Sequence, residues 1–480
     1  MNRFMVVLFS VIVVALFPVI QCNAAPVAPI VYVAGDGSGD YNCDGTADDV
    51  EIRAALRYVA TNDEFTTVYL KGPFTYDISN SLLLDSNTIL EGDSTAVLKR
   101  SAAADMIRAV SAGRTNITIR GFSIEAGDYG AHVISLGASW KNITINDMKI
   151  NGNIGNKKFA IAINPGSMPS ELANIRIFNN TITNFMYGAI ELGNIDGVEI
   201  YSNNFTGADL HYPLIMRITQ VNNLKIYDNV MCMQSVGAAG IQMNYNSNSN
   251  VVIDSVEIYN NQFIDIITAG VLLNGIEAGA GRGRAENVHI HHNIFRYNGV
   301  SNSTFGGGVT VNGFDKTLIE YNVFDSCGGA AIKSAKVSET PVRAEPYITF
   351  VRNNIIVNSW EHSSGGTGNA VYNKLNTSHT FVIDNNCVYN NTGENYLDAT
   401  ANSNLEADPL FADPDNYDYH LKSQAGRWND TTWVVDNEHS PCIDAGYPDS
   451  EFGNEPTPNG NRVNIGLYGN TEYASKSMQY

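Results

Sequence analysis

A short motif recurs along most of this 480-residue chain. It consists of an apolar residue, two mostly polar residues, Asn, any residue and a second apolar residue, as in Ile290–Phe295 (I-H-H-N-I-F). Successive copies lie 23 to 33 residues apart. Repeats of this length are typical of solenoids, in which each unit buries its apolar face against its neighbours. The shared Asn residues are Asn180, Asn203, Asn229, Asn261, Asn293, Asn322, Asn353 and Asn386.

Period-2 alternation around Ile and Val predicts a strand at each motif, and a second short strand follows most copies, as at Gly308–Val311. No copy carries a helix pattern that would build a βαβ unit. The sequence therefore predicts an all-β, right-handed parallel β-helix of about a dozen coils. Each Asn is expected to turn the chain and to hydrogen-bond to the Asn of the next coil, because an unpaired buried amide is costly.

The two ends of the chain differ from the repeats. Residues 1–24 have the pattern of a secretory signal, which predicts a secreted or cell-surface protein with no other membrane span. Residues 25–65 predict a strand and a short helix that cap the first coil, since an open end would expose apolar core and strand edges. The repeats fill residues 66–403, and the Pro-, Gly- and Asp-rich stretch 404–480 predicts an irregular C-terminal cap over the last coil.

The N-terminal cap also contains a calcium-loop pattern. Its oxygen-bearing side chains have the spacing of an EF-hand loop, although Ala47 stands where an apolar anchor is usual and no entering helix precedes it. Two interpretations stay open: a plain cap, and a cap that also binds Ca²⁺. No cofactor is expected to be required. The candidate calcium ligands are Asp40, Asn42, Asp44, Asp48 and Glu51.

Charge and cysteine content exclude some classes of function. With 29 basic and 49 acidic residues the chain has a formal net charge of −20, which disfavours nucleic acid as a partner. The cysteines beyond residue 24 are scattered and contain no C-x-x-C pair. They predict buried thiols rather than a disulfide framework or a zinc site.

Two stretches resemble known families. Asp44–Leu56 (D-G-T-A-D-D-V-E-I-R-A-A-L) resembles the N-terminal cap of pectin-lyase-like right-handed β-helix proteins. Residues 217–399, with Gly281–Phe295 (G-R-G-R-A-E-N-V-H-I-H-H-N-I-F) and Phe350–Asn358 (F-V-R-N-N-I-I-V-N), resemble the disaggregatase-associated β-helix region of surface proteins from methane-producing archaea. That resemblance implies a secreted protein that binds or cleaves a chondroitin-like extracellular polysaccharide. It carries over no catalytic residues.

One candidate site follows the strands after the Asn motifs. The middle residue of each strand is expected to point outward, because its neighbours are apolar and point inward. Stacked coil by coil, these residues put Glu191 beside Arg217, either as a solvated ion pair or as the acid–base and uronate-binding groups of a glycan site. The row is Glu191, Arg217, Gln242, Leu272, Thr310 and Lys333, and a second column is Asn244, Asn274 and Asn312.

A second candidate site is a Gly-rich loop and the strand after it. Arg282 and Arg284 form the best local anion site, and Glu277 precedes them in the same loop. His289 and His291 share one strand face, which predicts a pair of surface histidines at a glycan groove, with a metal pair as the alternative.

These features predict a protein that binds and cleaves an extracellular polysaccharide, with a non-catalytic glycan-binding or adhesion module as the alternative. Hydrolysis would need two carboxylates about 5 to 9.5 Å apart, for which the chain offers Glu191 with Asp209 or Glu277. Elimination from a uronate would need a base, such as Arg217 or Lys333, and a cation or an arginine to neutralise the substrate carboxylate. The sequence does not choose between these two routes.

Overall fold

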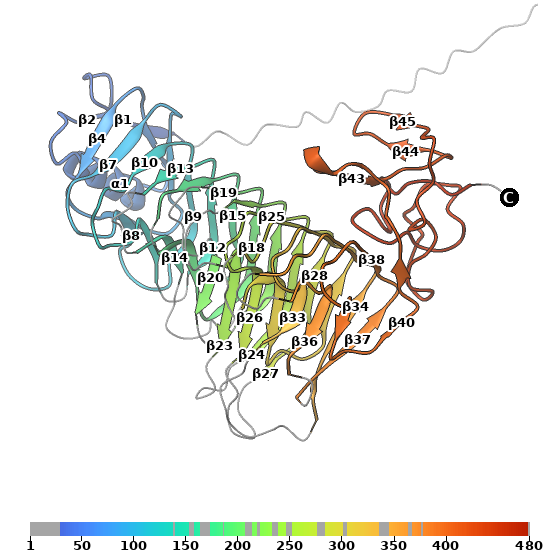
Figure 1. Ribbon diagram of the computed structural model, residues 1–480. Helices are drawn as coiled ribbons and strands as arrows, with labels where there is room; N and C mark the ends of the chain where they lie inside the picture. The colour runs from blue at the N-terminus through green and yellow to red at the C-terminus, as the bar shows by residue number, and fades with distance from the viewer. Residues whose placement is uncertain are drawn as a thin grey trace, which may run out of the picture.

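Each Asn motif folds into two strands joined by a corner at the Asn (Figure 1). In one coil, β28 (Val288–His291) precedes the corner, β29 (Ile294–Arg296) follows it and β30 (Gly307–Asn312) completes the turn. A coil therefore has three strands. The strand that the sequence analysis expected second, as at Gly308–Val311, is the third strand of its coil. The computed structural model describes residues 29–137, 140–152, 158–163, 173–185, 187–206, 214–217, 221–232, 239–245, 252–275, 284–300, 305–335, 345–362, 367–375 and 378–478. At residues 195, 214–217, 245, 252 and 284 it describes the backbone alone.

Strands of successive coils pair in parallel and build three long sheets along the described chain. The first sheet, before the Asn corner, contains β1 (Ile30–Ala34), β2 (Tyr41–Asn42), β3 (Thr67–Leu70), β6 (Ile89–Gly92), β9 (Thr115–Arg120), β12 (Lys141–Asn146), β15 (Ile175–Phe178), β18 (Ile195–Tyr201), β21 (Val221–Tyr227), β24 (Val252–Tyr259), β27 (Arg284–Ala285), β28, β31 (Thr317–Glu320), β34 (Tyr347–Arg352), β37 (His379–Asp384) and β40 (Ala401–Asn402).

The second sheet, after the corner, contains β4 (Thr75–Ile78), β7 (Val97–Arg100), β10 (Ser123–Glu125), β13 (Lys149–Asn151), β16 (Thr181–Thr183), β19 (Asn204–Thr206), β22 (Val230–Cys232), β25 (Gln262–Ile264), β29, β32 (Val323–Asp325), β35 (Ile355–Val357), β38 (Cys387–Tyr389) and β41 (Leu405–Glu406). The third sheet contains β5 (Leu82–Leu84), β8 (Ile107–Ala109), β11 (Ile134–Leu136), β14 (Phe159–Ile163), β17 (Gly188–Leu192), β20 (Leu214–Arg217), β23 (Ile241–Tyr245), β26 (Ala269–Gly275), β30, β33 (Ile332–Ser334), β36 (Val371–Asn373) and β39 (Tyr396–Leu397). The predicted all-β parallel β-helix is confirmed.

The core is a continuous column inside the three sheets. Alternation sends every second strand residue inward, so equivalent residues of successive coils stack on one another. Phe263, Phe295 and Phe324 are fully buried, and their ring centroids lie 4.7 and 4.6 Å apart. Each coil thus buries its apolar residues against the coils on either side.

The predicted column of asparagines runs along the interior corner. Each Nδ2 donates to the Oδ1 of the Asn in the next coil, at 2.9 to 3.0 Å, from Asn180 to Asn404. Each Nδ2 along the column also donates to a backbone carbonyl, as Asn293 does to Ile258 at 2.8 Å. The buried amides are therefore paired, as their burial requires. Asn404, placed beyond the last repeat by the sequence pattern, ends the column.

One predicted member of the column is wrong. Asn354, not Asn353, bonds to Asn322 at 3.0 Å. Asn353 lies at the corner with a left-handed φ of 57°, and its Oδ1 accepts a hydrogen bond from the backbone N–H of Tyr447. Because the motif at this coil reads F-V-R-N-N-I, the corner residue and the column residue are both Asn, and the pattern placed the column one residue early.

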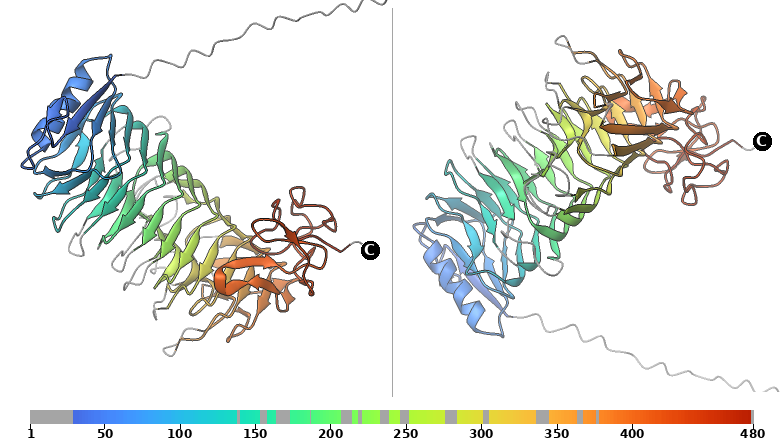
Figure 2. Two further views of the ribbon diagram at one scale, coloured as in Figure 1. Left: turned by 90° about the horizontal axis from the view of Figure 1, so that it is seen from above. Right: turned by 90° about the horizontal axis from the view of Figure 1, so that it is seen from below.

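The N-terminal end is capped by the helix α1 (Asp49–Thr61), as predicted (Figure 2). Its buried face, which includes Ile52 and Leu56, packs against β1 to β5. Asp48 precedes the helix and is buried. Its carboxylate accepts hydrogen bonds from the backbone N–H groups of Gly45 at 2.9 Å and Asp77 at 2.8 Å, which joins the cap to the first coils.

Residues 408–478, called the C-terminal segment here, fold beside the last coils (Figures 1 and 2). Their regular elements are β42 (Phe411–Asp413), the 3₁₀ helix η1 (Pro414–Asn416), β43 (Asp418–Leu421), β44 (Arg427–Trp428) and β45 (Trp433–Val434). The sequence placed this stretch over the last coil. Its core contacts instead lie on the outer face of the second sheet. The shared cluster contains Ile294, Val323, Ile355, Val357, Cys387, Tyr419, Leu421, Cys442, Ile443, Ile465 and Leu467.

Three other expectations concern the chain as a whole. Residues 1–24, the predicted signal, lie outside the described residues. In the described part of the chain, no helix combines the length and the hydropathy needed to cross a membrane. Cys43, Cys232, Cys327, Cys387 and Cys442 are free thiols, and all but Cys232 are buried.

Candidate functional site

The outer face of the third sheet carries the predicted row with one correction. Glu191 aligns with Ile215, while Arg217 aligns with Asn244 two residues further along. The predicted Glu191–Arg217 pair is therefore wrong in register. The position of β20 that aligns with Glu191 is an apolar residue in the sequence, and the search for polar residues passed over it. The row as observed is Glu191, Ile215, Gln242, Leu272, Thr310 and Lys333.

This row is too long to form one catalytic centre. Four strands, β20, β23, β26 and β30, separate the strand of Glu191 from that of Lys333. At about 4.8 Å per strand, the two residues lie about 24 Å apart. Glu191 and Lys333 therefore belong to different parts of the face. Glu277, Arg282 and Asp209 lie outside the described residues.

The predicted asparagine column on this face is confirmed in register. Asn244, Asn274 and Asn312 occupy paired positions of β23, β26 and β30. Asn274 donates from Nδ2 to Asn244 Oδ1 at 3.2 Å. Asn312 is fully buried; its Oδ1 accepts from Ala335 N at 2.7 Å, and its Nδ2 has no partner within the described chain. Since an unpaired buried amide is costly, this Nδ2 is a candidate ligand contact.

Lys333 lies on the same face, one coil beyond Asn312. It is 8% exposed and aligns with Thr310 on one side and Tyr372 on the other. Burial and the neighbouring ammonium of Lys374 lower the pKa of Lys333 to about 8. A buried amine with such a pKa is partly unprotonated near neutral pH, and a free amine can abstract a proton.

The two histidines of the second predicted site share one strand face, as expected. His289 Nε2 lies 3.0 Å from Glu320 Oε1, and its ring centroid is 4.1 Å from that of His291. His291 is less accessible than a surface residue, because its ring also stacks on Tyr259 with centroids 5.0 Å apart. Burial, with help from the neighbouring histidines, lowers the pKa of His291 to about 2. Arg284, described by its backbone, lies in β27 of the first sheet.

Four of the five residues proposed as calcium ligands hydrogen-bond to backbone groups of the cap and the first coils. Asp40 Oδ2 accepts from Tyr32 N at 2.8 Å, and Asp44 Oδ1 accepts from Thr46 N at 3.0 Å. The Asn42 amide exchanges two hydrogen bonds of 2.9 Å with Gly39. Asp48 is bonded to backbone N–H groups as well, while its carboxylate, that of Glu51 and the Cys43 thiol have ligand atoms within 4.8 Å of one another. This arrangement favours the cap interpretation, and calcium binding stays a prediction.

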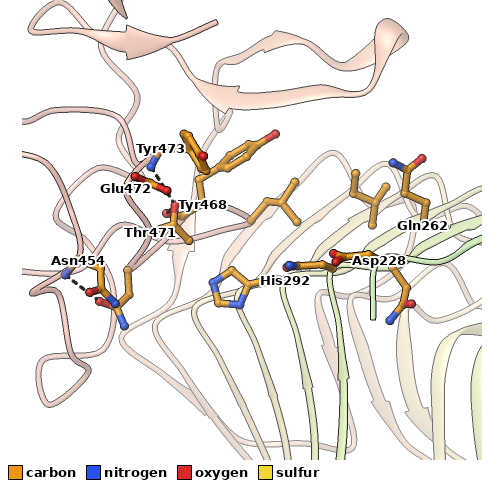
Figure 3. A pocket seen from close by; sticks show the side chains of 13 residues that line it. Asp228, Gln262, His292, Asn454, Tyr468, Thr471, Glu472 and Tyr473 are labelled. Atoms are coloured by element: carbon orange, nitrogen blue, oxygen red, sulfur yellow. Dashed lines mark hydrogen bonds between the residues drawn. The ribbon is translucent and has the colours of Figure 1, made fainter. Parts of the chain in front are cut away.

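A groove that sequence reasoning missed lies where the C-terminal segment meets the solenoid (Figure 3). Its volume is about 640 Å³. The corner between the first and second sheets forms one wall, and the turn at residues 467–473 forms the other.

The sequence contained a signal for the contact between the C-terminal segment and the second sheet. The outward residues at the start of β29, β32 and β35 are Ile294, Val323 and Ile355, whereas β16, β19 and β25 carry Thr181, Asn204 and Gln262 there.

Comparisons with known proteins agree with this architecture. Residues 253–446 match the family described as Disaggregatase related, so the match begins later and ends later than the resemblance at 217–399. No curated protein matches the chain.

Solved structures match over most of the chain. The mannuronan C-5 epimerase AlgE6 A-module of Azotobacter vinelandii is 15% identical with a TM-score of 0.53, over 76% of this chain and 97% of that one. The AlgE4 A-module from the same organism is 13% identical with a TM-score of 0.50, over 78% and 100%. A mutant tailspike protein of E. coli bacteriophage HK620, in complex with a pentasaccharide, is 14% identical with a TM-score of 0.53, over 75% and 66%. The chain is therefore a parallel β-helix protein, and its residues 253–446 match the model of the disaggregatase-related family.

Proposed function

We propose that this chain is an extracellular protein that binds a uronate-containing polysaccharide along the outer face of the third sheet and cleaves it by elimination. The observation that carries the proposal is Lys333, a buried amine whose pKa is lowered to about 8. A glycan ligand is supported by the disaggregatase-related match and by the printed substrates of proteins that share the fold, a mannuronan epimerase and a tailspike bound to a pentasaccharide.

The chemistry uses the free base of Lys333. Its Nζ takes the proton from the carbon next to the uronate carboxylate. The electron pair left behind forms a carbon–carbon double bond while the bond to the leaving sugar oxygen breaks. That oxygen takes a proton from solvent. Each turnover therefore gives one unsaturated sugar end and one new reducing end.

Neighbouring residues fit the charge changes of this reaction. Lys374 is exposed and close enough to lower the pKa of Lys333, so its ammonium is placed to offset the negative charge that grows on the substrate carboxylate. The Nδ2 of Asn312, which has no partner among the described residues, offers a donor to a sugar oxygen. Hydrolysis is less well supported, because it needs two carboxylates and the residues aligned with Lys333 on this face, Thr310 and Tyr372, supply none.

The test is to incubate the mature protein with uronate oligosaccharides, with and without a chelator. Two signals are followed: absorbance of unsaturated products and new reducing ends. We expect both in the wild type and neither in Lys333→Met. Lys225→Met is the matched control, since Lys225 is a partly exposed lysine of the first sheet that pairs with Glu257 at 3.0 Å. Reducing ends without new absorbance would mean hydrolysis. Binding with neither signal would mean a non-catalytic glycan-binding module.

A further inference from the structure

We infer that the groove between the C-terminal segment and the solenoid is a second binding site, which takes an uncharged oligosaccharide and rejects uronates. The site lies on the corner between the first and second sheets, away from Lys333 on the third. The inference therefore goes beyond the proposed function, and it stands whether or not the third sheet cleaves a glycan.

The size and make-up of the groove fit a sugar ligand. A volume of about 640 Å³ lies in the usual range for small-ligand sites. The solenoid contributes carboxylate, amide and imidazole groups, and the C-terminal segment contributes amides, a hydroxyl, a carboxylate and two phenols (Figure 3). The polar lining residues are Asp228, Asn260, Asn261, Gln262, His292, Asn454, Tyr468, Asn470, Thr471, Glu472 and Tyr473.

The wall from the C-terminal segment is held in place before any ligand arrives. The backbone N–H of Asn470 donates to Oε1 of the buried Glu455 at 2.8 Å. The hydroxyl of Thr471 donates to the carbonyl of Tyr468 at 2.7 Å. The ring of Tyr468 stacks on His420, with centroids 3.6 Å apart. A wall that is already ordered lowers the conformational-entropy cost of binding a ligand.

The opposite wall is equally constrained. Asn261 at its base belongs to the interior asparagine column and donates to Asn293 at 3.0 Å. His292, at the corner of the next coil, donates from Nε2 to the carbonyl of Gly469 at 3.0 Å and so ties the two walls together. Asp228 and Asn260 stand exposed at the equivalent corners of the two preceding coils.

Charge decides which sugars the groove accepts. Its lining holds the carboxylates of Asp228 and Glu472 and no lysine or arginine among the described residues. A hydrogen bond to the carboxylate of the adjacent Glu472, together with the charge of that carboxylate, raises the pKa of the Tyr473 hydroxyl. A uronate or sulfated sugar would be repelled here. The hydroxyls of an uncharged sugar instead donate to carboxylates in charge-assisted hydrogen bonds.

Tyr473 offers the apolar surface that a sugar ring needs. Its side chain is 43% exposed although it lines the groove. An aromatic ring with an accessible face packs against the C–H face of a pyranose, while its hydroxyl stays hydrogen-bonded. The combination of an exposed tyrosine, several amides and two carboxylates therefore points to an uncharged hexose or N-acetylhexosamine chain.

Calorimetric titration with three matched probes tests this site: an N-acetylglucosamine trisaccharide, its deacetylated cationic form and a galacturonate trisaccharide. We expect the uncharged probe to bind and Tyr473→Ala to weaken it at least about tenfold. Tyr389→Ala, which removes a tyrosine of similar exposure (42%) from β38, should leave its affinity within about twofold. The double variant Asp228→Asn with Glu472→Gln should weaken the uncharged probe and strengthen the uronate probe.

Several results would overturn the inference. They are no binding of the uncharged probe, tighter binding of the cationic or uronate probe through Tyr473, or an affinity that Tyr473→Ala leaves unchanged. Uronate binding that persists in Tyr473→Ala and is lost in Lys333→Met belongs to the third sheet. The two variants therefore distinguish a failure of the groove proposal from a failure of the third-sheet proposal.

Discussion

The imidazole Nε2 of His292 donates a hydrogen bond to the carbonyl oxygen of Gly469 across 3.0 Å, joining a corner of the solenoid to the C-terminal segment. Because Nε2 carries the proton, the neutral ring has its acceptor at Nδ1. That atom lies 2.8 Å from Nδ1 of His291, which must therefore be the donor. This hydrogen bond requires His292 to be neutral, because a protonated Nδ1 could not accept it.

Replacing His292 by Asn should loosen the C-terminal segment without disturbing the coil. Asn suits the left-handed φ of 53° at this corner, and Asn260 holds the same corner one coil earlier. The variant loses the bond to Gly469 and the ring stack on Tyr321, whose centroid is 5.0 Å away. We expect docking of the segment to weaken by about 1–2 kcal/mol. Limited proteolysis should then cut the segment faster, while His289→Asn, which loses only contacts within the solenoid, to Glu320 and His291, should behave as wild type.

Acid should weaken the same contact. Burial lowers the pKa of His291 to about 2 and lowers that of His292 below the ordinary value of 6.5. His289 and Lys225 add to the effect on His291, while Glu320 opposes it on His292. The unfolded chain then binds more protons than the folded one below pH 6.5, so stability is full above that pH and is lost as the pH falls. Proteolysis at pH 5 and pH 7.5 should show this loss, and a segment equally protected at both would contradict it.

Glu455 should give the opposite pH dependence. It is 5% exposed, and burial raises its pKa from 4.5 to about 7, with the carboxylate of Asp444 adding to the rise. The folded state thus keeps a proton that the unfolded state loses. Its contribution is full below pH 4.5 and is lost as the pH rises through 7. We expect Glu455→Gln, which keeps an acceptor for Asn464 N and Asn470 N, to be stabilised relative to wild type at pH 8 by up to about 3 kcal/mol and to match it at pH 4.5. Equal unfolding midpoints at pH 8 would refute this.

The solenoid could be predicted because the sequence pattern that specifies each coil is short and repeats along the chain. An apolar residue three positions before an Asn, as Ile290 before Asn293, recurs in the coils from Asn180 to Asn386, so one of these coils predicts the next. Register failed where a coil departed from the pattern. Ile215 is an apolar residue at the position that aligns with Glu191, and Asn353 is an Asn beside the column residue.

The groove could not be predicted because its contacts join distant parts of the chain. Arg296, for example, donates to the carbonyl of Pro414, and Tyr419 donates to Asp325 at 2.9 Å. The apolar outward residues Ile294 and Val323 indicated that another part of the protein covers the second sheet. Nothing in them identified the C-terminal segment as the cover.

Removing one amide from the interior column should destabilise the whole solenoid. Asn293 is fully buried; its Nδ2 donates to Ile258 O at 2.8 Å and to Asn322 Oδ1 at 3.0 Å, and its Oδ1 accepts from Asn261 N at 2.9 Å. Asn293→Ala leaves the partner groups unpaired in the core, so we expect a loss of about 3–5 kcal/mol in the free energy of unfolding.

Chemical denaturation followed by circular dichroism measures this loss. Asn454→Ala is the matched control, because Asn454 is exposed and donates to Asn470 from its backbone N–H rather than from its side-chain amide. It should unfold within about 0.5 kcal/mol of wild type. If Asn293→Ala unfolds as the control does, the column turns the chain without stabilising it. In that case the stacked aliphatic and aromatic side chains alone hold the coils together.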